Sequence, residues 1–172
     1  MPIIQDISRY QELLGEADFF KDFEKAELRT LIEACDRKTL APREALWAVG
    51  TKGDAAYILV EGRLEQVRRL PPDGTRIDQH DEPGTVIGLS YVVKGWKHQS
   101  SATALERTEF LKLERAKFQK MFDTGEMAAY RLVDQLAEDL VQEMRDANRR
   151  LHEVFGNPAE TLRTLRRRVR QG

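Results

Sequence analysis

The chain has 172 residues, of which 41% are hydrophobic and 33% charged, and its formal net charge is -1. This composition is typical of a globular protein that can bury a core without disulfides or metals, and it excludes a polyelectrolyte that attracts nucleic acid or membranes over long range. The single cysteine excludes an intrachain disulfide, and neither a signal peptide nor an apolar run of about 18 residues is found. We therefore expect a cytoplasmic protein.

Residues 1–35 are predicted to be helical. The stretch KDFEKAELRTLIEAC places apolar side chains at spacings of three and four, which indicates an amphipathic helix. The preceding turn-like EADFFKDF holds three phenylalanines, which we expect to pack this helix onto the next layer. Cys35 lies on the apolar face and is expected to be buried and structural.

From Asp36 the hydrophobic period changes to two. Segments bounded by glycine and proline predict about eight short strands, and PPDGTR predicts a tight hairpin turn. Their spacing is typical of an antiparallel sandwich or barrel rather than a parallel sheet. The segments are DRKTL, EALWAVG, AAYILVEG, RLEQVRRL, RIDQHDEPG, TVIGL, SSATALE and TEFLKLE.

Helical periodicity returns near Glu114. RAKFQKMF predicts a short helix, and residues 126–155 predict a long one without proline or glycine, ended by Gly156 and Pro158. Apolar or small residues recur along the long helix as a heptad seam, which predicts a parallel homodimer. The seam consists of Tyr130, Val133, Ala137, Leu140, Met144, Ala147, Leu151 and Val154.

This order of elements resembles the cyclic nucleotide-binding domain family, which includes the sensor half of catabolite-activator-type regulators. AAYILVEGRLEQVRR, LPPDGTRIDQHDEPGTVIG and ALERTEFLKLERAKFQKMF resemble the family's hairpins, its approach to the phosphate-binding cassette and its hinge helix. The resemblance covers roughly residues 15–155. It implies an α+β fold: an antiparallel β-barrel (jelly roll) with N-terminal helices and a long C-terminal dimerisation helix. The expected parts are residues 1–125, 126–155 and a basic tail, 156–172.

The cassette of this family reads roughly G-E-x-A-L, followed nine or ten residues later by R-[ST]-A. Its acid accepts the ribose hydroxyl, and its arginine neutralises the cyclic phosphate. Here Gly88 matches the glycine, but Leu89 stands at the acid position and His98 at the arginine position, with Lys97 as the neighbour if the register slips. The degenerate cassette that the resemblance implies comprises Gly84, Gly88, Leu89, Ser90, Lys97, His98, Gln99 and Ser100.

Leucine cannot accept the ribose hydroxyl, and neutral histidine lacks the charged fork of arginine. We therefore expect binding of cyclic AMP and cyclic GMP to be lost. Two alternatives stay open: the pocket takes a different small ligand, or it is closed and filled by Leu89 and Trp96. A glycine expected in an earlier turn is Arg43.

No spacing of His, Cys or acidic residues predicts a metal site, a cofactor or a catalytic centre. After the long helix we expect no winged-helix DNA-binding domain, because too few residues follow. The sequence therefore predicts a non-enzymatic regulatory or adaptor module that binds a protein partner. The alternatives are a sensor of a different ligand, and a nucleic-acid-associated regulator that uses the tail arginines Arg163, Arg166, Arg167, Arg168 and Arg170.

Overall fold

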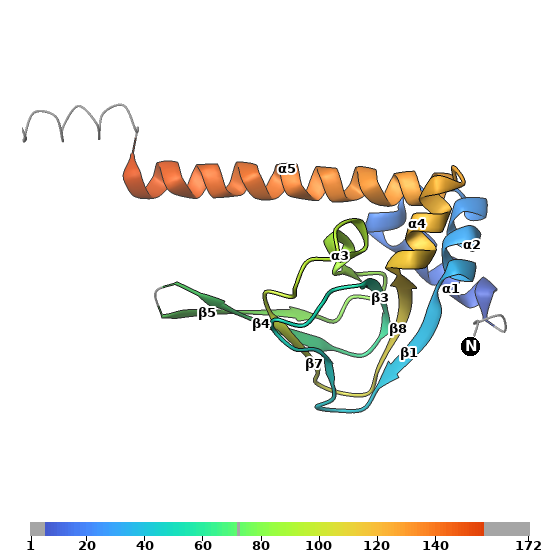
Figure 1. Ribbon diagram of the computed structural model, residues 1–172, viewed down its shortest axis with the longest axis horizontal. Helices are drawn as coiled ribbons and strands as arrows, with labels where there is room; N and C mark the ends of the chain where they lie inside the picture. The colour runs from blue at the N-terminus through green and yellow to red at the C-terminus, as the bar shows by residue number, and fades with distance from the viewer. Residues whose placement is uncertain (1–5, 72, 157–172) are drawn as a thin grey trace, which may run out of the picture. The chain divides into compact units, whose positions relative to one another are not determined.

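The computed structural model describes residues 6–71 and 73–156, and internal contacts divide the chain into two units, Met1–Asp134 and Gln135–Gly172. The helices, labelled in Figure 1, are α1 (Ile7–Glu16), the 3-10 turn η1 (Asp18–Phe20), α2 (Lys25–Ala34), α3 (Leu89–Val93), α4 (Arg115–Asp123) and α5 (Met127–Phe155). The strands are β1 (Asp36–Leu40), β2 (Ala45–Trp47), β3 (Ala55–Glu61), β4 (Leu64–Leu70), β5 (Gly74–His80), β6 (Val86–Ile87), β7 (Ser101–Ala104) and β8 (Thr108–Glu114).

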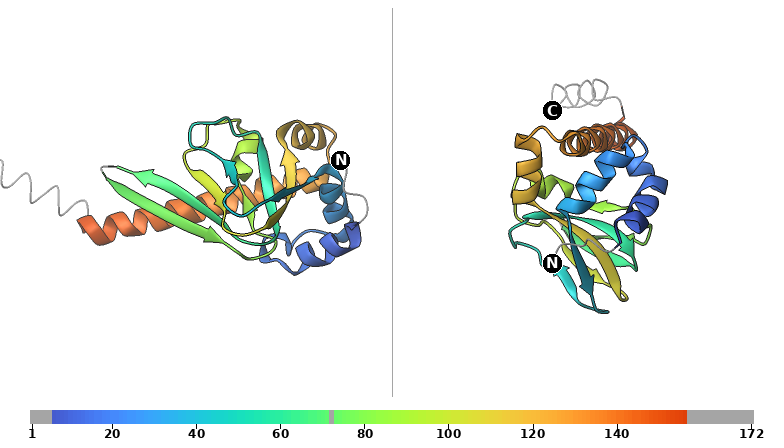
Figure 2. Two further views of the ribbon diagram at one scale, coloured as in Figure 1. Left: turned by 90° about the horizontal axis from the view of Figure 1, so that it is seen from below. Right: turned by 90° about the vertical axis from the view of Figure 1, so that its right-hand side faces the viewer.

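Within the described residues, the strands form two antiparallel sheets of four, in the orders β1-β8-β3-β6 and β2-β7-β4-β5. The α+β jelly roll expected from the sequence is thereby confirmed. Strands β4 and β5 pair from Leu64 opposite His80 to Leu70 opposite Gly74, and Figure 2 shows this hairpin extending beyond the other strands of its sheet. Strand β3 pairs with both β6 and β8 and is buried except at Glu61, which shows that both of its faces are covered.

The core lies between the two sheets. Apolar side chains from both sheets pack there, and Trp47 and Tyr57 are its largest members on β2 and β3. Removing this much apolar area from water is the main favourable term in folding the unit. The cluster comprises Leu40, Trp47, Ala55, Tyr57, Leu59, Leu64, Ile87, Ala102, Ala104 and Phe110.

The N-terminal segment is helical, as predicted, and its turn-like part contains η1. Phe20 and Phe23 are buried there with their rings in edge contact. Helix α2 begins with a capping box, in which the Glu24 and Glu27 side chains satisfy each other's backbone N–H groups. It ends at Ala34, and the next residue, Cys35, is buried as expected. Burial raises the pKa of the Cys35 thiol to about 12, so the group stays protonated and unreactive.

Helix α1 is hydrogen-bonded to the first sheet through a buried carboxylate. Glu109 on β8 is only 1% exposed, and its Oε1 accepts a hydrogen bond of 2.9 Å from the Tyr10 hydroxyl. Arg37 on β1 donates to its Oε2 and supplies the opposite charge. A buried carboxylate needs such partners, because an unpaired one would be strongly destabilising.

Helices α4 and α5 end the described chain, and the long helix predicted over residues 126–155 is confirmed to within one residue. Helix α5 begins in the first unit and ends in the second. In its first turns Leu132 is buried, and Arg131 forms a 3.3 Å ion pair with Glu27 of α2. No helix among the described residues combines the length and apolar character that a membrane crossing requires.

Candidate functional site

The cassette region begins where β6 ends. Gly88 follows with a positive φ of 76° and caps the short helix α3, whose first residue, Leu89, is buried. A loop then leads through His98 to β7. The elements around a phosphate-binding cassette are therefore present in the order that the resemblance implies.

His98 lies inside an aromatic cluster. Its ring stacks on Trp47 with a centroid separation of 4.4 Å and an interplanar angle of 6°, and it meets the Tyr91 ring edge-on at 4.2 Å. Trp47 also contacts Tyr57 across the core at 5.7 Å. Because His98 is only 6% exposed, the side chain that the resemblance places at the family's arginine position is part of the packed interior.

Backbone hydrogen bonds hold His98 in this place. Its N–H donates to the Thr51 carbonyl and its carbonyl accepts from the Gly50 N–H, both at 2.8 Å. The Gly53 N–H donates to the Trp96 carbonyl at 2.9 Å. A side chain at Gly53 would begin 2.5 Å from the Tyr91 ring, so this glycine leaves room for the aromatic cluster.

The interior carries little charge at this point. Burial lowers the pKa of His98, an effect that the Asp54 carboxylate partly opposes, so the imidazole is neutral at pH 7. Trp47 Nε1 and His98 Nδ1 are both buried without a hydrogen-bond partner among the described residues. Two unsatisfied nitrogens in one stack are unusual, because each costs roughly 1–3 kcal/mol unless a water or a ligand supplies the bond.

A short polar chain continues beyond His98 along the second sheet. The Ser100 hydroxyl accepts a hydrogen bond of 2.7 Å from Gln66 Nε2, and Gln66 Oε1 lies 3.3 Å from His80 Nε2. Burial lowers the pKa of His80, although Asp78 and Asp81 oppose the shift. These groups can donate and accept hydrogen bonds, but at neutral pH they offer no fixed positive charge to a phosphate.

The structure divides the sequence-predicted cassette into a buried and an exposed set. Gly84, Leu89, His98 and Ser100 are buried, Gly88 and Ser90 are partly buried, and Lys97 and Gln99 are exposed. In the alternative of a closed pocket, the part given to Trp96 is wrong, because this residue is 59% exposed. Trp47 and Tyr91 occupy the interior beside His98 instead.

Trp47, Tyr57, Tyr91 and Gln66 are the contributors to this site that the sequence analysis missed. Trp47 lies 51 positions before His98, and hydrophobic alternation indicates only that a side chain faces inward. Which side chain Trp47 contacts depends on how the loop that carries His98 lies against β2. No local signal in the sequence specifies that contact.

The structure describes only part of the two other predicted surfaces, the dimerisation seam and the tail arginines. Along the dimerisation seam of α5, Tyr130, Leu140, Met144 and Leu151 are exposed, and so are Ala137 and Ala147, whereas Val133 is partly buried. Val154 lies outside the residues whose side chains are described, and the tail arginines lie outside the described residues altogether. Within the described ranges, no three His, Cys, Asp or Glu side chains gather as metal ligands.

Solved structures share this fold at low sequence identity. The Thermus thermophilus catabolite activator protein is 20% identical with a TM-score of 0.69, over 80% of this chain and 63% of its own, so this chain spans less than two thirds of that structure. A cyclic nucleotide-binding domain from Methylobacillus flagellatus is 19% identical with a TM-score of 0.70, over 88% and 86% of the two chains. The regulatory subunit of a cAMP-independent protein kinase A from Trypanosoma cruzi, bound to guanosine, is 19% identical with a TM-score of 0.68, over 89% and 52%.

Comparison with curated protein sequences gives no match. The model of the cyclic nucleotide-binding domain family matches residues 37–125, just over half of the 172-residue chain. This match runs from β1 to the end of α4 and includes the whole cassette region. The chain therefore belongs to the cyclic nucleotide-binding domain family.

Proposed function

We propose that this chain is a non-enzymatic regulatory or adaptor module that does not bind cyclic AMP or cyclic GMP, dimerises through α5 and binds a protein partner. One observation carries the proposal: the family's acid and arginine positions hold Leu89 and a neutral His98, both buried. The family consists mostly of regulatory binding domains, which supports a role without catalysis.

The energetic consequence of the two replacements is large. A ribose hydroxyl buried against leucine loses its partner at a cost of about 1–3 kcal/mol. Loss of the charge-assisted phosphate contact costs roughly another 1.5–3 kcal/mol. Together these losses weaken binding on the order of 10²- to 10⁴-fold. The packing of His98 against Trp47 and Tyr91 adds a steric obstacle, because a ligand would first have to displace the ring.

Calorimetric titration at pH 7 tests the proposal. We expect no binding of cyclic AMP or cyclic GMP in the low micromolar range. We expect Leu89→Glu combined with His98→Arg to raise the affinity for cyclic AMP, because it restores the hydroxyl acceptor and the phosphate cation. A ligand-dependent increase in the melting temperature of the double variant should accompany the gain.

A matched control separates position from charge. Ser90→Glu combined with Gln99→Arg adds the same two charges one residue away, at side chains that are less buried. This pair should not gain affinity. Low-micromolar binding of either nucleotide to the natural chain would contradict the proposal. Equal gains in the two double variants would show that an added pair of charges anywhere near the pocket raises the affinity, and that the two cassette positions have no special role.

The unsatisfied nitrogens favour one second candidate, a sensor of an uncharged, ring-shaped ligand. Trp47 Nε1 offers a hydrogen bond without a charge, and an aromatic ligand could replace the stacked His98 ring on Trp47. The related kinase subunit from Trypanosoma cruzi was solved with guanosine, which makes guanosine a suitable probe. Micromolar binding of guanosine that is lost in Trp47→Phe would favour this candidate over the adaptor.

A further inference from the structure

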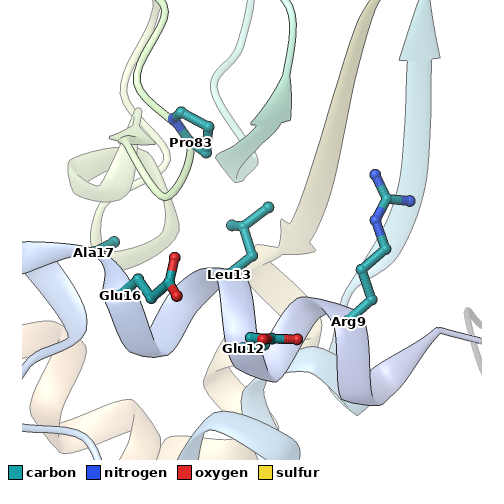
Figure 3. Close-up of a pocket in the computed structure, with 6 residues that line it drawn as sticks. All are labelled: Arg9, Glu12, Leu13, Glu16, Ala17 and Pro83. Carbon is teal, nitrogen blue, oxygen red and sulfur yellow. The ribbon is translucent and has the colours of Figure 1, made fainter.

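A groove runs along the N-terminal helices, where α1 and η1 face the loop between β5 and β6. It consists of two hollows of about 490 and 440 Å³ that share Glu16, Ala17 and Pro83. Figure 3 shows the first hollow, with Arg9 and Leu13 projecting from α1 toward the side on which Pro83 lies. The second hollow continues past Asp18 and Phe19 to Val86.

The two walls of the groove are fixed against each other. Ala17 lies so close to Gly84 that a Cβ atom on Gly84 would be 2.3 Å from the Ala17 Cβ. The Gly84 N–H also donates to the Leu59 carbonyl at 2.7 Å, which ties the loop to the core strand β3. On the other wall, Tyr10 and Leu14 anchor α1 in the interior. The groove is therefore preformed, which lowers the entropic cost of binding a partner.

The rim of the groove is acidic and largely uncompensated. Glu12, Glu16, Asp18 and Glu82 are all exposed, and none of them forms an ion pair with another described residue. The lining includes one cation, Arg9, whose guanidinium lies 3.6 Å from the Glu61 carboxylate. The rim therefore attracts positive charge.

The floor of the groove is apolar. Its carbon surface comes from Leu13, Ala17, Phe19, Pro83 and Val86. An apolar strip bordered by carboxylates suits a polypeptide that carries both basic and apolar side chains. It does not suit a metal ion, since no three of these carboxylates gather as ligands among the described residues, and it repels nucleic acid.

We propose that this acidic groove is the docking site for a basic, amphipathic segment of a partner protein. The inference rests on the proposed adaptor function, for which it names the binding surface and the chemistry of the partner. The arginine or lysine side chains of the segment pair with Glu12, Glu16, Asp18 and Glu82. Its apolar side chains cover Leu13 and Phe19.

Fluorescence anisotropy on the full chain tests this assignment. The probe is a labelled twelve-residue peptide of alternating leucine and arginine, and the same peptide with glutamate for arginine is its control. The natural chain should bind the basic probe, and added salt should weaken the binding. Glu12→Lys with Glu16→Lys should weaken it by about tenfold or more, since two attractive rim contacts become repulsive.

A matched pair of charge reversals keeps the result specific. Glu138→Lys with Glu143→Lys changes the net charge by the same amount at exposed positions of α5. Because these positions do not line the groove, the affinity for the probe should change less than about threefold. Leu13→Ala should also weaken binding, whereas the glutamate peptide should not bind. Equal losses in the two charge-reversed pairs, or no saturable binding up to about 1 mM, would overturn the proposal.

The same experiment distinguishes other occupants. If Glu12→Lys with Glu16→Lys lowered the mass of the chain in solution, the groove would be filled by a second copy. If replacing Arg166, Arg167 and Arg168 with alanine strengthened probe binding tenfold or more, the occupant would be the chain's own tail. Either result overturns the assignment to a partner. Nucleotide calorimetry tests the proposed function, and peptide anisotropy tests the groove. A failure of one proposal can therefore be distinguished from a failure of the other.

Discussion

The hydrogen bond between Tyr10 and the buried Glu109 makes the stability of the folded chain depend on pH in the alkaline range. Burial, followed by the hydrogen bond and the negative charge of Glu109, raises the pKa of Tyr10 to about 12. The folded state thus favours the neutral phenol, so its contribution is fully present below the unfolded pKa near 10 and is lost as pH rises through about 12.

Replacing this tyrosine should remove part of that pH dependence. We expect Tyr10→Phe to lower the free energy of unfolding at pH 7 by about 1–2 kcal/mol, because Glu109 loses a donor while Arg37 still balances its charge. Between pH 10 and 12 the natural chain should lose stability more steeply than the variant, by up to about 2 kcal/mol. Urea unfolding at several pH values measures both effects. Parallel curves for the two proteins would contradict the assignment.

At the scale of elements, the turn between β1 and β2 adopts a backbone conformation that suits its sequence poorly. The Glu44 N–H donates to the Ala41 carbonyl at 3.0 Å, which closes a four-residue turn with Pro42 in second place and Arg43 in third. Arg43 has a φ of 69° and is the one described non-glycine residue with a positive φ. A turn with proline second and positive φ third is the type II pattern, which favours glycine at the third place.

Arg43→Gly should therefore stabilise the chain. The left-handed region costs a side-chain-bearing residue roughly 1–2 kcal/mol, and the extra unfolded-state freedom of glycine takes back about 0.4–1 kcal/mol. A net gain of about 0.5–1 kcal/mol should be visible in chemical denaturation. Arg43→Ala is the control, because it removes the exposed side chain but keeps the strain and should change stability little. A gain in Arg43→Ala equal to that in Arg43→Gly would point to charge rather than conformation.

This turn illustrates which features of the fold the sequence predicts. Glycine and proline delimit the strands, and alternation identifies inward positions, so the elements and the jelly roll follow from local patterns. The resemblance also marks Arg43 as a departure from glycine, and the structure supplies its positive φ. The short β2 is harder to predict, because a register shift between Ala45 and Trp47 interrupts its pairing with β7.

The candidate site shows where such prediction stops. Leu89 and His98 can be recognised by their spacing within the cassette, because a motif fixes positions along the chain. The partners of His98 depend on contacts between distant segments: Trp47 comes from β2 and Tyr91 from α3. The link between Tyr10 and Glu109 spans 99 positions and has no local signature. Tertiary packing determines these contacts, and the hydrophobic periodicity of the sequence does not specify them.

At the scale of the whole molecule, the exposed apolar stripe of α5 is the basis for the predicted dimer. Leu140, Met144 and Leu151 are 49%, 66% and 54% exposed. They recur at heptad spacing on one face of a continuous helix. Each such side chain is worth roughly 1.5–3 kcal/mol when fully buried, so a second copy of the helix would stabilise the exposed face substantially. In a parallel pair Ala147 of one chain meets Ala147 of the other, and Ala147→Cys should form a disulfide-linked dimer on oxidation.

We expect the 19.8 kDa chain to have about twice this mass in solution at micromolar concentration, as measured by light scattering. Leu140→Asp with Leu151→Asp should shift the mass to that of the monomer, because a dimer would then bury unpaired carboxylates in its seam. Circular dichroism should show that the sheets remain folded. Gln142→Asp with Asn148→Asp adds the same negative charge at exposed positions outside the seam and should leave the dimer intact. A monomeric natural chain, or equal dissociation in both double variants, would be incompatible with dimerisation through this stripe.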